Sequence, residues 1–353
     1  MPVMRDAFDE LLCATVVRLP APPNGAAQAR VAFDELLALT APLPLPLLPE
    51  WERRLRHAWW HARHHHSRAA ASARAPRWLA RLPFARARPE AAACVFPPWL
   101  ALVSGDGHER EGALRALAGP VPNRFFFALA LRRLNDWVPQ VRAAARATLV
   151  PLAQASDPDH VVDALCAVLP AWTSWGRLQA PERALMAALI ALDGVNAALV
   201  RRLLSATHGP LASALTQCLR TAALDPHLSA IAARAVQPAV RAAAYRALLS
   251  GRAVWLEGHE REWIDLRYCV SRMRPILGER PLDHAPPFLQ TLAAAAADRA
   301  FRVRRVAAQA LVIEMDRLAP DVLTEWARRF AGDRSPCVAQ RGAFILERLA
   351  AAR

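Results

Sequence analysis

The densest group of chemically versatile side chains lies between residues 51 and 66, where histidines and tryptophans are mixed with arginines. His57, His61 and His65 recur at intervals of four, so they share one stripe of a helix, and two of them could bind a transition metal through imidazole nitrogens. The nearby carboxylates are Glu50 and Glu52, and the surrounding arginines would repel a cation. We therefore favour a solvated histidine cluster and expect neither a metal nor another cofactor.

The same segment carries a face of arginines and tryptophans that is a candidate for binding an acidic partner or a nucleic acid. Its residues are Arg53, Arg54, Arg56, Trp59, Trp60 and Arg63. Arginines neutralise phosphates and tryptophans stack on bases, which would suit a nucleic acid. Adjacent tryptophans also dock helices, with arginine stems covering apolar surface. We prefer core packing for the tryptophans and leave the arginines open between a solvated surface and an acidic partner.

The common catalytic motifs are missing from the sequence. It contains no G-x-G-x-x-G after a strand, no P-loop, no G-x-S-x-G and no cysteine and histidine set with zinc-finger spacing. Gly-His-Glu-Arg-Glu occurs at 107–111 and again at 258–262, but neither copy continues to the H-E-x-x-H of zinc proteases. We expect each copy to begin a helix, with its acids at the positive end of the helix dipole. We therefore expect that the protein is not an enzyme.

The positive charge of the chain is unevenly distributed. Its 353 residues include 45 basic and 31 acidic side chains, a formal net charge of +14, and every basic residue is arginine. Residues 51–90 contain ten arginines against Glu52 and Glu90, so this segment alone contributes +8. A basic protein of this kind is expected to bind an acidic partner, and the location of the charge suggests that the N-terminal third would form the contact.

The cysteines and the N-terminus indicate a cytoplasmic protein. Single cysteines without a C-x-x-C pair are expected to be buried small hydrophobes in a reducing compartment. They are Cys13, Cys94, Cys166, Cys218, Cys269 and Cys337. The first ten residues carry acids where a signal peptide has a basic and then an apolar run, and no apolar stretch approaches the length of a membrane span. No membrane association is expected.

A recurrent helical pattern organises the chain from about residue 120 onward. Each copy places an apolar residue, a small one four positions on, and two more small, branched or aliphatic residues at plus seven and plus eight. The copies are Val141/Ala145/Thr148/Leu149, Val240/Ala244/Ala247/Leu248, Val303/Ala307/Ala310/Leu311 and Val338/Gly342/Ile345/Leu346. These positions share one helical face, so each copy predicts a helix whose small residues let a neighbour approach closely. The four leucines are predicted to be buried.

The beginnings of the copies also agree. A proline stands two residues before the apolar anchor in three copies, where it costs the helix no hydrogen bond, and an aspartate stands five before it, placed to cap the helix. An arginine follows the anchor in three copies. The prolines are Pro139, Pro238 and Pro336, the aspartates Asp136, Asp298 and Asp333, and the arginines Arg142, Arg241 and Arg304.

These features resemble the HEAT repeat, including the bacterial HEAT-like variety related to phycobilin lyases. In that family an aspartate before the second helix and an arginine just inside it commonly form a ladder from repeat to repeat. The resemblance therefore implies a structural ladder of Asp136, Arg142, Arg241, Asp298, Arg304 and Asp333. It covers about 120–350 well and the preceding residues weakly.

The fold implied by this resemblance is all-α, a right-handed α-solenoid of HEAT-like helix pairs with a divergent N-terminal helical region. Three parts are expected, namely a helical hairpin with a Pro-rich linker at 1–48, a basic helical segment at 49–90 and the solenoid at 91–353. Stacked helix pairs form a concave surface that holds proteins, so we expect a non-enzymatic scaffold for a protein partner. The alternative is a nucleic-acid-binding HEAT-like protein, including a base-excision enzyme of the DNA glycosylase type.

Overall fold

The structure is a computed structural model that describes residues 2–19, 26–74 and 97–351. Helices make up most of it, together with one two-stranded sheet, so the expectation of a mostly helical chain is confirmed and the sheet is an addition to it. Two compact units are present. The first comprises Met1–Val168 and Gly176–Leu185, and the second comprises Leu169–Trp175 and Met186–Arg353. In these described ranges, no single helix is both long enough and apolar enough to cross a membrane.

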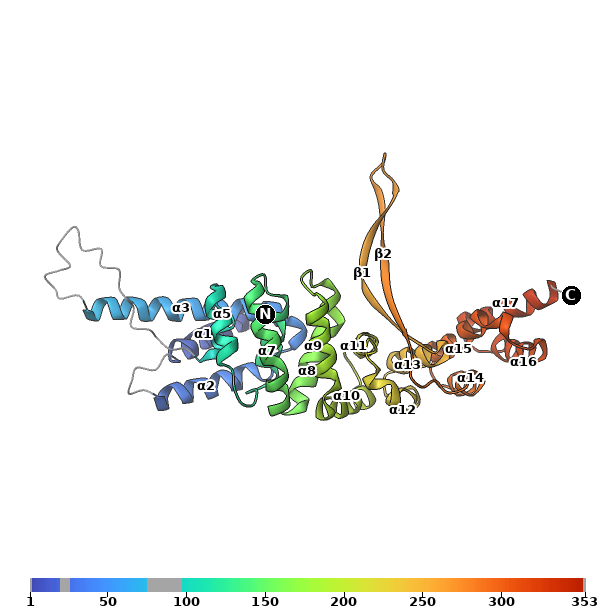
Figure 1. Ribbon diagram of the computed structural model, residues 1–353, viewed down its shortest axis with the longest axis horizontal. Coiled ribbons are helices and arrows are strands. Elements are labelled where there is room, and N and C mark those ends of the chain that lie inside the picture. The colour runs from blue at the N-terminus through green and yellow to red at the C-terminus, as the bar shows by residue number, and fades with distance from the viewer. Residues whose placement is uncertain (1, 20–25, 75–96, 352–353) are drawn as a thin grey trace. The chain divides into compact units, whose positions relative to one another are not determined.

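The first unit begins with a group of three helices and continues as two helical layers. Helix α1 packs against both α2 and α3, and α3 also contacts α6. Beyond this group α5 packs on α7, and α6 packs on α8 (Figure 1). The helices are α1 (Pro2–Val17), α2 (Ala26–Thr40), α3 (Leu48–Arg74), α4 (Pro98–Ala101), α5 (Gly107–Ala116), α6 (Arg124–Arg132), α7 (Pro139–Ala155) and α8 (Pro158–Val168). After α8 come a 3-10 segment of the second unit, Leu169–Ser174, and α9 (Ala180–Ala191), which begins in the first unit and ends in the second.

The second unit ends in three helix pairs whose second members contact one another. Helix α12 pairs with α13, α14 with α15, and α16 with α17, while α13 packs on α15 and α15 packs on α17. The helices are α10 (Asp193–Ser205), α11 (Leu211–Cys218), α12 (Leu228–Arg234), α13 (Pro238–Ser250), α14 (Phe288–Ala296), α15 (Phe301–Ile313), α16 (Pro320–Ala331) and α17 (Pro336–Ala351). A 3-10 segment, Ala222–His227, precedes α12.

The recurrent stripe lies on α7 in the first unit and on α13, α15 and α17 in the second unit, where α13 packs on α15 and α15 on α17. Leu149, Leu248 and Leu311 are buried, which confirms their prediction, whereas Leu346 is only half-buried. The second position of the stripe, four residues after the apolar anchor, requires a small residue, and the requirement is strictest in α17. A Cβ added to Gly342 would overlap the backbone of α16 at Ala327, Phe330 and Ala331, so these two helices pack too closely for any side chain there.

A β-hairpin interrupts the helices between α13 and α14. Gly251 ends α13 in the left-handed conformation, with φ 63°, a geometry that glycine adopts at little cost. The antiparallel strands that follow are β1 (Arg252–Asp265) and β2 (Val270–Pro281), with register shifts at Leu256/Gly258 and Trp263/Asp265. In Figure 1 the hairpin extends away from the helices of its own unit.

The two Gly-His-Glu-Arg-Glu copies therefore differ in structure. The copy at 107–111 begins α5 behind Asp106, whose side chain accepts from the N–H of His108 at 2.8 Å, as expected of a helix start. The copy at 258–262 lies within β1, so the predicted helix start there is wrong. Its neighbours Trp255, Trp263 and Ile264 favour a strand, and pairing with β2 outweighs the local helix signal.

The cysteines are not uniformly buried. Cys166 and Cys218 lie in the interior, and Cys13 and Cys337 are half-buried. Cys269 is exposed in the hairpin turn with φ 53°, so the expectation of burial is wrong for this residue, because it lies at the tip of a projecting element. Cys94 and the expected boundary between 90 and 91 lie outside the described residues.

Candidate partner-binding site

Three arginines make the same set of hydrogen bonds in different parts of the chain. In each case Nε and Nη2 donate to the two carboxylate oxygens of an aspartate that precedes the next packed helix, at 2.6–2.9 Å. Nη1 donates to the backbone carbonyls six and five residues earlier, at 2.8–3.1 Å. The pairs are Arg110 with Asp136, Arg241 with Asp298, and Arg304 with Asp333. Each arginine thus joins two helices that pack together, α5 to α7, α13 to α15 and α15 to α17.

Arg142 differs from these three arginines, although its position in the sequence repeat is the same. Its Nη1 donates to the backbone oxygen of Asp136 at 2.9 Å, within its own repeat. The carboxylate of Asp136 is instead bound by Arg110, which the sequence analysis did not select. Glu109 occupies the place of the apolar anchor before Arg110 and hides the repeat. A search for arginines at the helix start, without the apolar anchor, would have found it.

The ladder aspartates form turns before the helices rather than capping them. Each accepts the N–H two residues further on, from Val138 at 3.0 Å, Ala300 at 2.7 Å and Ser335 at 2.8 Å. Helices α7 and α15 have no side-chain cap, so the capping expectation is wrong for these two helices. The reason is geometric, because each carboxylate is bound by an arginine of the helix packed beside its own, two α-helices earlier in the chain, and accepts an N–H of its own loop.

The facing arginines lower the pKa of all three ladder carboxyls. For Asp136 and Asp298 partial burial would raise the pKa, but the hydrogen bonds from Arg110 and Arg241 outweigh burial and hold the pKa below its ordinary value. For Asp333 the hydrogen bond from Arg304 is the largest influence, and it lowers the pKa. The ladder carboxylates are therefore ionised at neutral pH.

A buried charge network in the first unit extends the ladder toward α3. Glu52 is bonded to Arg133, and it also pairs with Arg132 at 2.8 Å and with Arg56 at 2.9 Å. Arg133 in turn reaches Asp136 at 3.3 Å. Burial would raise the pKa of Glu52, but its arginines lower it below the ordinary value. This role of Glu52 depends on Arg132 and Arg133, about 80 residues away in the chain, so local sequence pattern does not reveal it.

The basic face proposed on α3 is largely engaged within the fold. Arg54 pairs with Glu50 at 2.8 Å and with Asp9 at 3.4 Å. Arg56 pairs with Glu52 and donates to a backbone carbonyl at 3.0 Å, and Arg63 pairs with Glu109. Arg53 is the exposed member of this face for which no ion pair is recorded among the described residues.

The two neighbouring tryptophans have different environments. Trp59 is buried, as expected of a core anchor, with Arg63 stacked 5.2 Å from its ring. Trp60 is 50% exposed and its ring lies 3.8 Å from that of His64, so the prediction of core packing is wrong for Trp60. The buried stripe of α3 consists of Leu55, Ala58, Trp59 and Ala62, and Trp60 lies just outside it.

The histidine stripe does not come together as a metal site. The Nε2 atoms of His57 and His61 lie 3.0 Å apart, at the distance of a hydrogen bond between them. His65 lies apart from this pair and faces the ring of His66 at 5.4 Å. Across the described ranges, no group of three or more His, Cys, Asp or Glu side chains is placed to hold a metal ion.

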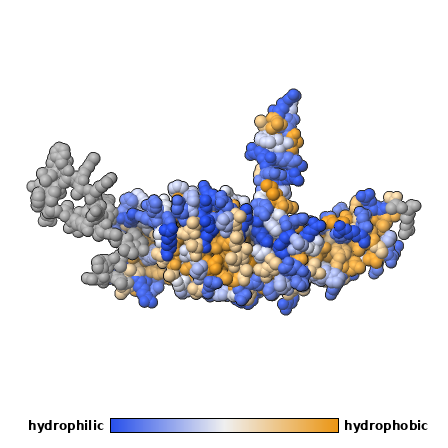
Figure 2. All heavy atoms as spheres, in the orientation of Figure 1, coloured by the Kyte–Doolittle hydropathy of each residue, from blue (hydrophilic) through white to orange (hydrophobic). Residues whose placement is uncertain are grey.

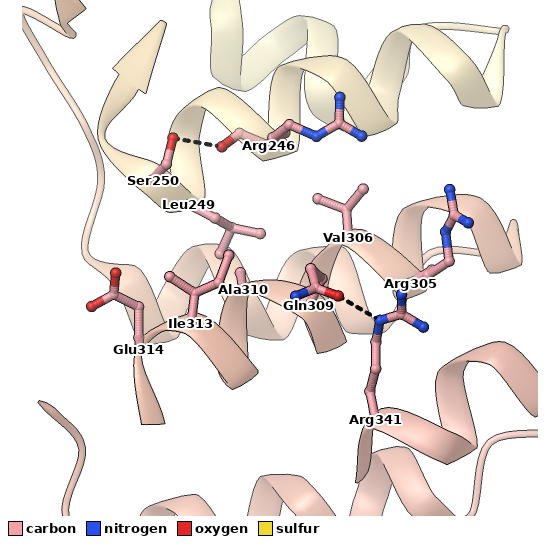
Figure 3. Close-up of a pocket in the computed structure, with 10 residues that line it drawn as sticks. All are labelled: Arg246, Leu249, Ser250, Arg305, Val306, Gln309, Ala310, Ile313, Glu314 and Arg341. Carbon is pink, nitrogen blue, oxygen red and sulfur yellow. Dashed lines mark hydrogen bonds between the residues drawn. The ribbon is translucent and has the colours of Figure 1, made fainter. Parts of the chain in front are cut away.

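A groove of about 340 Å³ lies along α13, α15 and α17 in the second unit (Figure 3). Its apolar lining consists of Leu249, Val306, Ala310 and Ile313. Its polar lining consists of Arg246, Ser250, Arg305, Gln309, Glu314 and Arg341. Because these helices are the ones that the ladder joins, the ladder also fixes the groove's width.

The groove arginines differ from the ladder arginines in lacking carboxylate partners. Among the described residues no ion pair is recorded for Arg246, Arg305 or Arg341. Arg341 is held by Gln309, whose oxygen accepts from its Nε at 2.8 Å (Figure 3). The acidic lining residue, Glu314, accepts from Arg317 at 2.9 Å. The groove therefore presents three uncompensated positive charges beside an apolar surface.

The hairpin is clamped at its base to the helices of the second unit. Arg280 on β2 binds both oxygens of Asp225 at 2.6 and 2.8 Å. On the other strand, Arg220 donates to the carbonyl of Leu256 at 2.8 Å and pairs with Glu257 at 2.9 Å. These contacts hold both strands where they leave the helical body, so the hairpin has a fixed direction within its unit.

The outer part of the hairpin has one face of ion pairs and one face that carries its apolar side chains. Successive strand residues point to opposite faces, and residues paired across strands share a face. Glu262 pairs with Arg272 at 2.7 Å on one face, beside Glu260 and Arg274 at 3.9 Å. The opposite face carries three cross-strand pairs, His259/Pro275, Arg261/Met273 and Trp263/Ser271, so its apolar side chains lie beside polar ones. Figure 2 shows hydrophilic and hydrophobic residues side by side along this element.

The apolar side chains of this outer part are exposed. Met273 is 59% exposed, and the turn adds Leu266 at 74% and Tyr268 at 72%.

In comparisons with known proteins, no family model, curated protein or solved structure matches this chain.

Proposed function

We propose that this protein is a non-enzymatic scaffold, a right-handed solenoid of HEAT-like helix pairs, that holds a protein partner. The observation that carries this proposal is the clamped hairpin with its exposed apolar face and tip. Exposed apolar patches on a soluble surface mark interaction sites, because leaving them in water is unfavourable. Trp263, Met273, Leu266 and Tyr268 give the hairpin large side chains of the kind that dominate protein interfaces.

The arginines of α3 favour a protein partner over the nucleic-acid alternative. Arg54, Arg56 and Arg63 have carboxylate partners inside the fold, which a phosphate would have to displace. Trp59 is buried and cannot stack on a base without local unfolding. The proposal places the scaffold in the cytoplasm, which is consistent with single cysteines without a C-x-x-C pair.

Site-specific photo-crosslinking in cells of the source organism tests the hairpin as the contact. A crosslinker at Met273 reports on the apolar face, and a matched one at Arg274 reports on the opposite face one residue away. We expect a discrete protein adduct from position 273 and none from position 274. Equal adducts from both positions, or none from either in a folded protein, would contradict the proposal. An adduct that nuclease removes would favour the nucleic-acid alternative.

A shortened hairpin provides the second arm of this test. Replacing Gly258–Pro275 with Asn-Gly leaves Glu257 and Ile276 to be joined by a two-residue turn and keeps both basal clamps. We expect this variant to retain the thermal stability of the full chain and to lose the partner when co-purified with it. Retained binding by a stable shortened variant would show that the hairpin is not the contact.

A further inference from the structure

We propose that the groove along α13, α15 and α17 binds an acidic segment of a partner protein, with its carboxylates on the arginines and an apolar side chain on the floor. This inference rests on the proposed scaffold function but concerns a different surface from the hairpin. Its basis is the chemistry of the groove lining, in which an apolar floor and guanidinium groups without carboxylate partners occur together.

The groove is preformed because the ladder fixes the helices that line it. Arg241 on α13 is bonded to Asp298 before α15, and Arg304 on α15 is bonded to Asp333 before α17. Both arginines are buried. A binding surface held in this way loses little conformational entropy when a ligand arrives.

The charges of the groove come from three different helices. Arg246 belongs to α13, Arg305 to α15 and Arg341 to α17, and Figure 3 shows all three around the floor. Arg246 and Arg305 are exposed, while Arg341 is half-buried and positioned by Gln309 and by the carbonyl of Cys337 at 2.5 Å. A single straight helix of this protein could not present charges in this arrangement, so the site depends on helix packing.

The apolar lining of the groove determines which class of ligand fits it. Guanidinium groups bind carboxylates and phosphates alike through paired N–H donors. A nucleic-acid backbone would leave the 68% exposed Ile313, the outermost apolar residue of the groove lining, without an apolar partner. An acidic peptide with apolar side chains satisfies both parts of the groove, because it brings carboxylates for the arginines and a hydrocarbon group for the floor.

Fluorescence anisotropy with a synthetic peptide tests this inference on the full chain. The probe is a labelled peptide of alternating Glu-Leu-Glu-Glu-Leu units, compared with one in which every Glu is Gln and one in which every Leu is Ser. We expect the acidic, leucine-containing peptide to bind at least tenfold more tightly than either comparison peptide, and more weakly as salt is added. Equal binding of the Gln peptide would overturn the role of the arginines.

A matched pair of variants separates the groove from net charge. The test variant is Arg246→Glu with Arg305→Glu and Arg341→Glu, and the control is Arg30→Glu with Arg177→Glu and Arg234→Glu, exposed arginines outside the groove. We expect the test variant to lose at least tenfold in affinity while the control changes it less than threefold and both unfold at the temperature of the unmodified chain. Equal losses in the two variants would overturn the inference.

Two further outcomes keep this inference distinct from the proposed scaffold function. Tighter binding of a labelled DNA duplex through the same three arginines would overturn the acidic-protein occupant. If the peptide fails to bind but the hairpin crosslink at Met273 persists, the groove inference falls and the scaffold proposal stands. Peptide binding without the crosslink would support the groove and contradict the role of the hairpin.

Discussion

Arg241 and Arg246 lie five residues apart on α13 but occupy opposite environments. Arg241 is buried, with both carboxylate oxygens of Asp298 and two carbonyls as partners. Arg246 is exposed beside an apolar groove, and no ion pair is recorded for it among the residues that the structure describes. The difference shows that a high arginine content does not define one role. Buried arginines align successive helices here, and the exposed ones remain available to a ligand.

Acid should lower the free energy of unfolding more than any single substitution does, because it protonates several of the carboxylates that are paired with buried arginines at once. The pKa values of Glu52, Asp136, Asp298 and Asp333 are lowered in the folded state by their arginines. Their contribution is therefore complete above the unfolded-state pKa of about 4 and is lost as pH falls below it. Urea unfolding at pH 7, 5, 4 and 3 should show a falling free energy of unfolding only below about pH 5. A constant value down to pH 3 would contradict the structural role of these pairs.

Replacing one buried ladder arginine should have the next largest effect. Arg241→Ala leaves Asp298 without its partner in a mostly buried position, so we expect a loss of about 3–5 kcal/mol in the free energy of unfolding. Arg246→Ala should change it by no more than about 0.5 kcal/mol. Urea titration of the two variants measures the contrast directly, and similar losses would remove the distinction between the two sets.

The close spacing of α16 and α17 can be tested at Gly342. In Gly342→Ala the new methyl group would overlap the backbone of α16, and we expect a loss of about 1–3 kcal/mol as α17 moves away. The matched control is Gly112→Ala, at an exposed position of α5 with no atom near the new Cβ. That change should stabilise the chain by up to about 1 kcal/mol. A neutral result at Gly342 in thermal unfolding would show that the helices can separate freely.

Arg142 provides the smallest and most specific comparison. The repeat pattern places it in the ladder, but its side chain donates to one backbone carbonyl of its own repeat. Arg142→Ala should therefore cost about 0.5–1.5 kcal/mol, the range for a hydrogen bond, and clearly less than Arg241→Ala. If calorimetry gave equal losses for the two variants, Arg142 would have an inter-repeat partner comparable to Asp298.

The residue spacing within each segment was sufficient to predict the repeat helices. It was not sufficient to predict which side chains contact one another between helices. The spacing from Val303 to Leu311 defines a helical face without reference to any other element, and the leucine at its end is buried as predicted. The pairing of Arg110 with Asp136 depends on how far apart α5 and α7 lie, which no local pattern contains. The same holds for the groove, whose lining comes from three helices.

The two Gly-His-Glu-Arg-Glu copies show why the hairpin was missed. The pentapeptide is identical at 107–111 and 258–262, so its own helix signal could not distinguish a helix from a strand. At 258–262 the outcome depends on pairing with residues 272–276, across an intervening turn. The bulky residues Trp255 and Trp263 were the available signal, and recognising the alternation around them would have favoured a strand.

The bond from the N–H of Leu282 to the carbonyl of Gly251, at 3.0 Å, has a consequence for how the chain folds. It joins the two ends of the hairpin, so residues 252–281 leave the helical body and return at nearly one point. Closing so long a segment as a flexible loop would be entropically unfavourable, but strand pairing from the turn inward closes it in small local steps. Formation of the hairpin on the microsecond timescale would therefore bring α13 and α14 together early, as if they were neighbours in sequence.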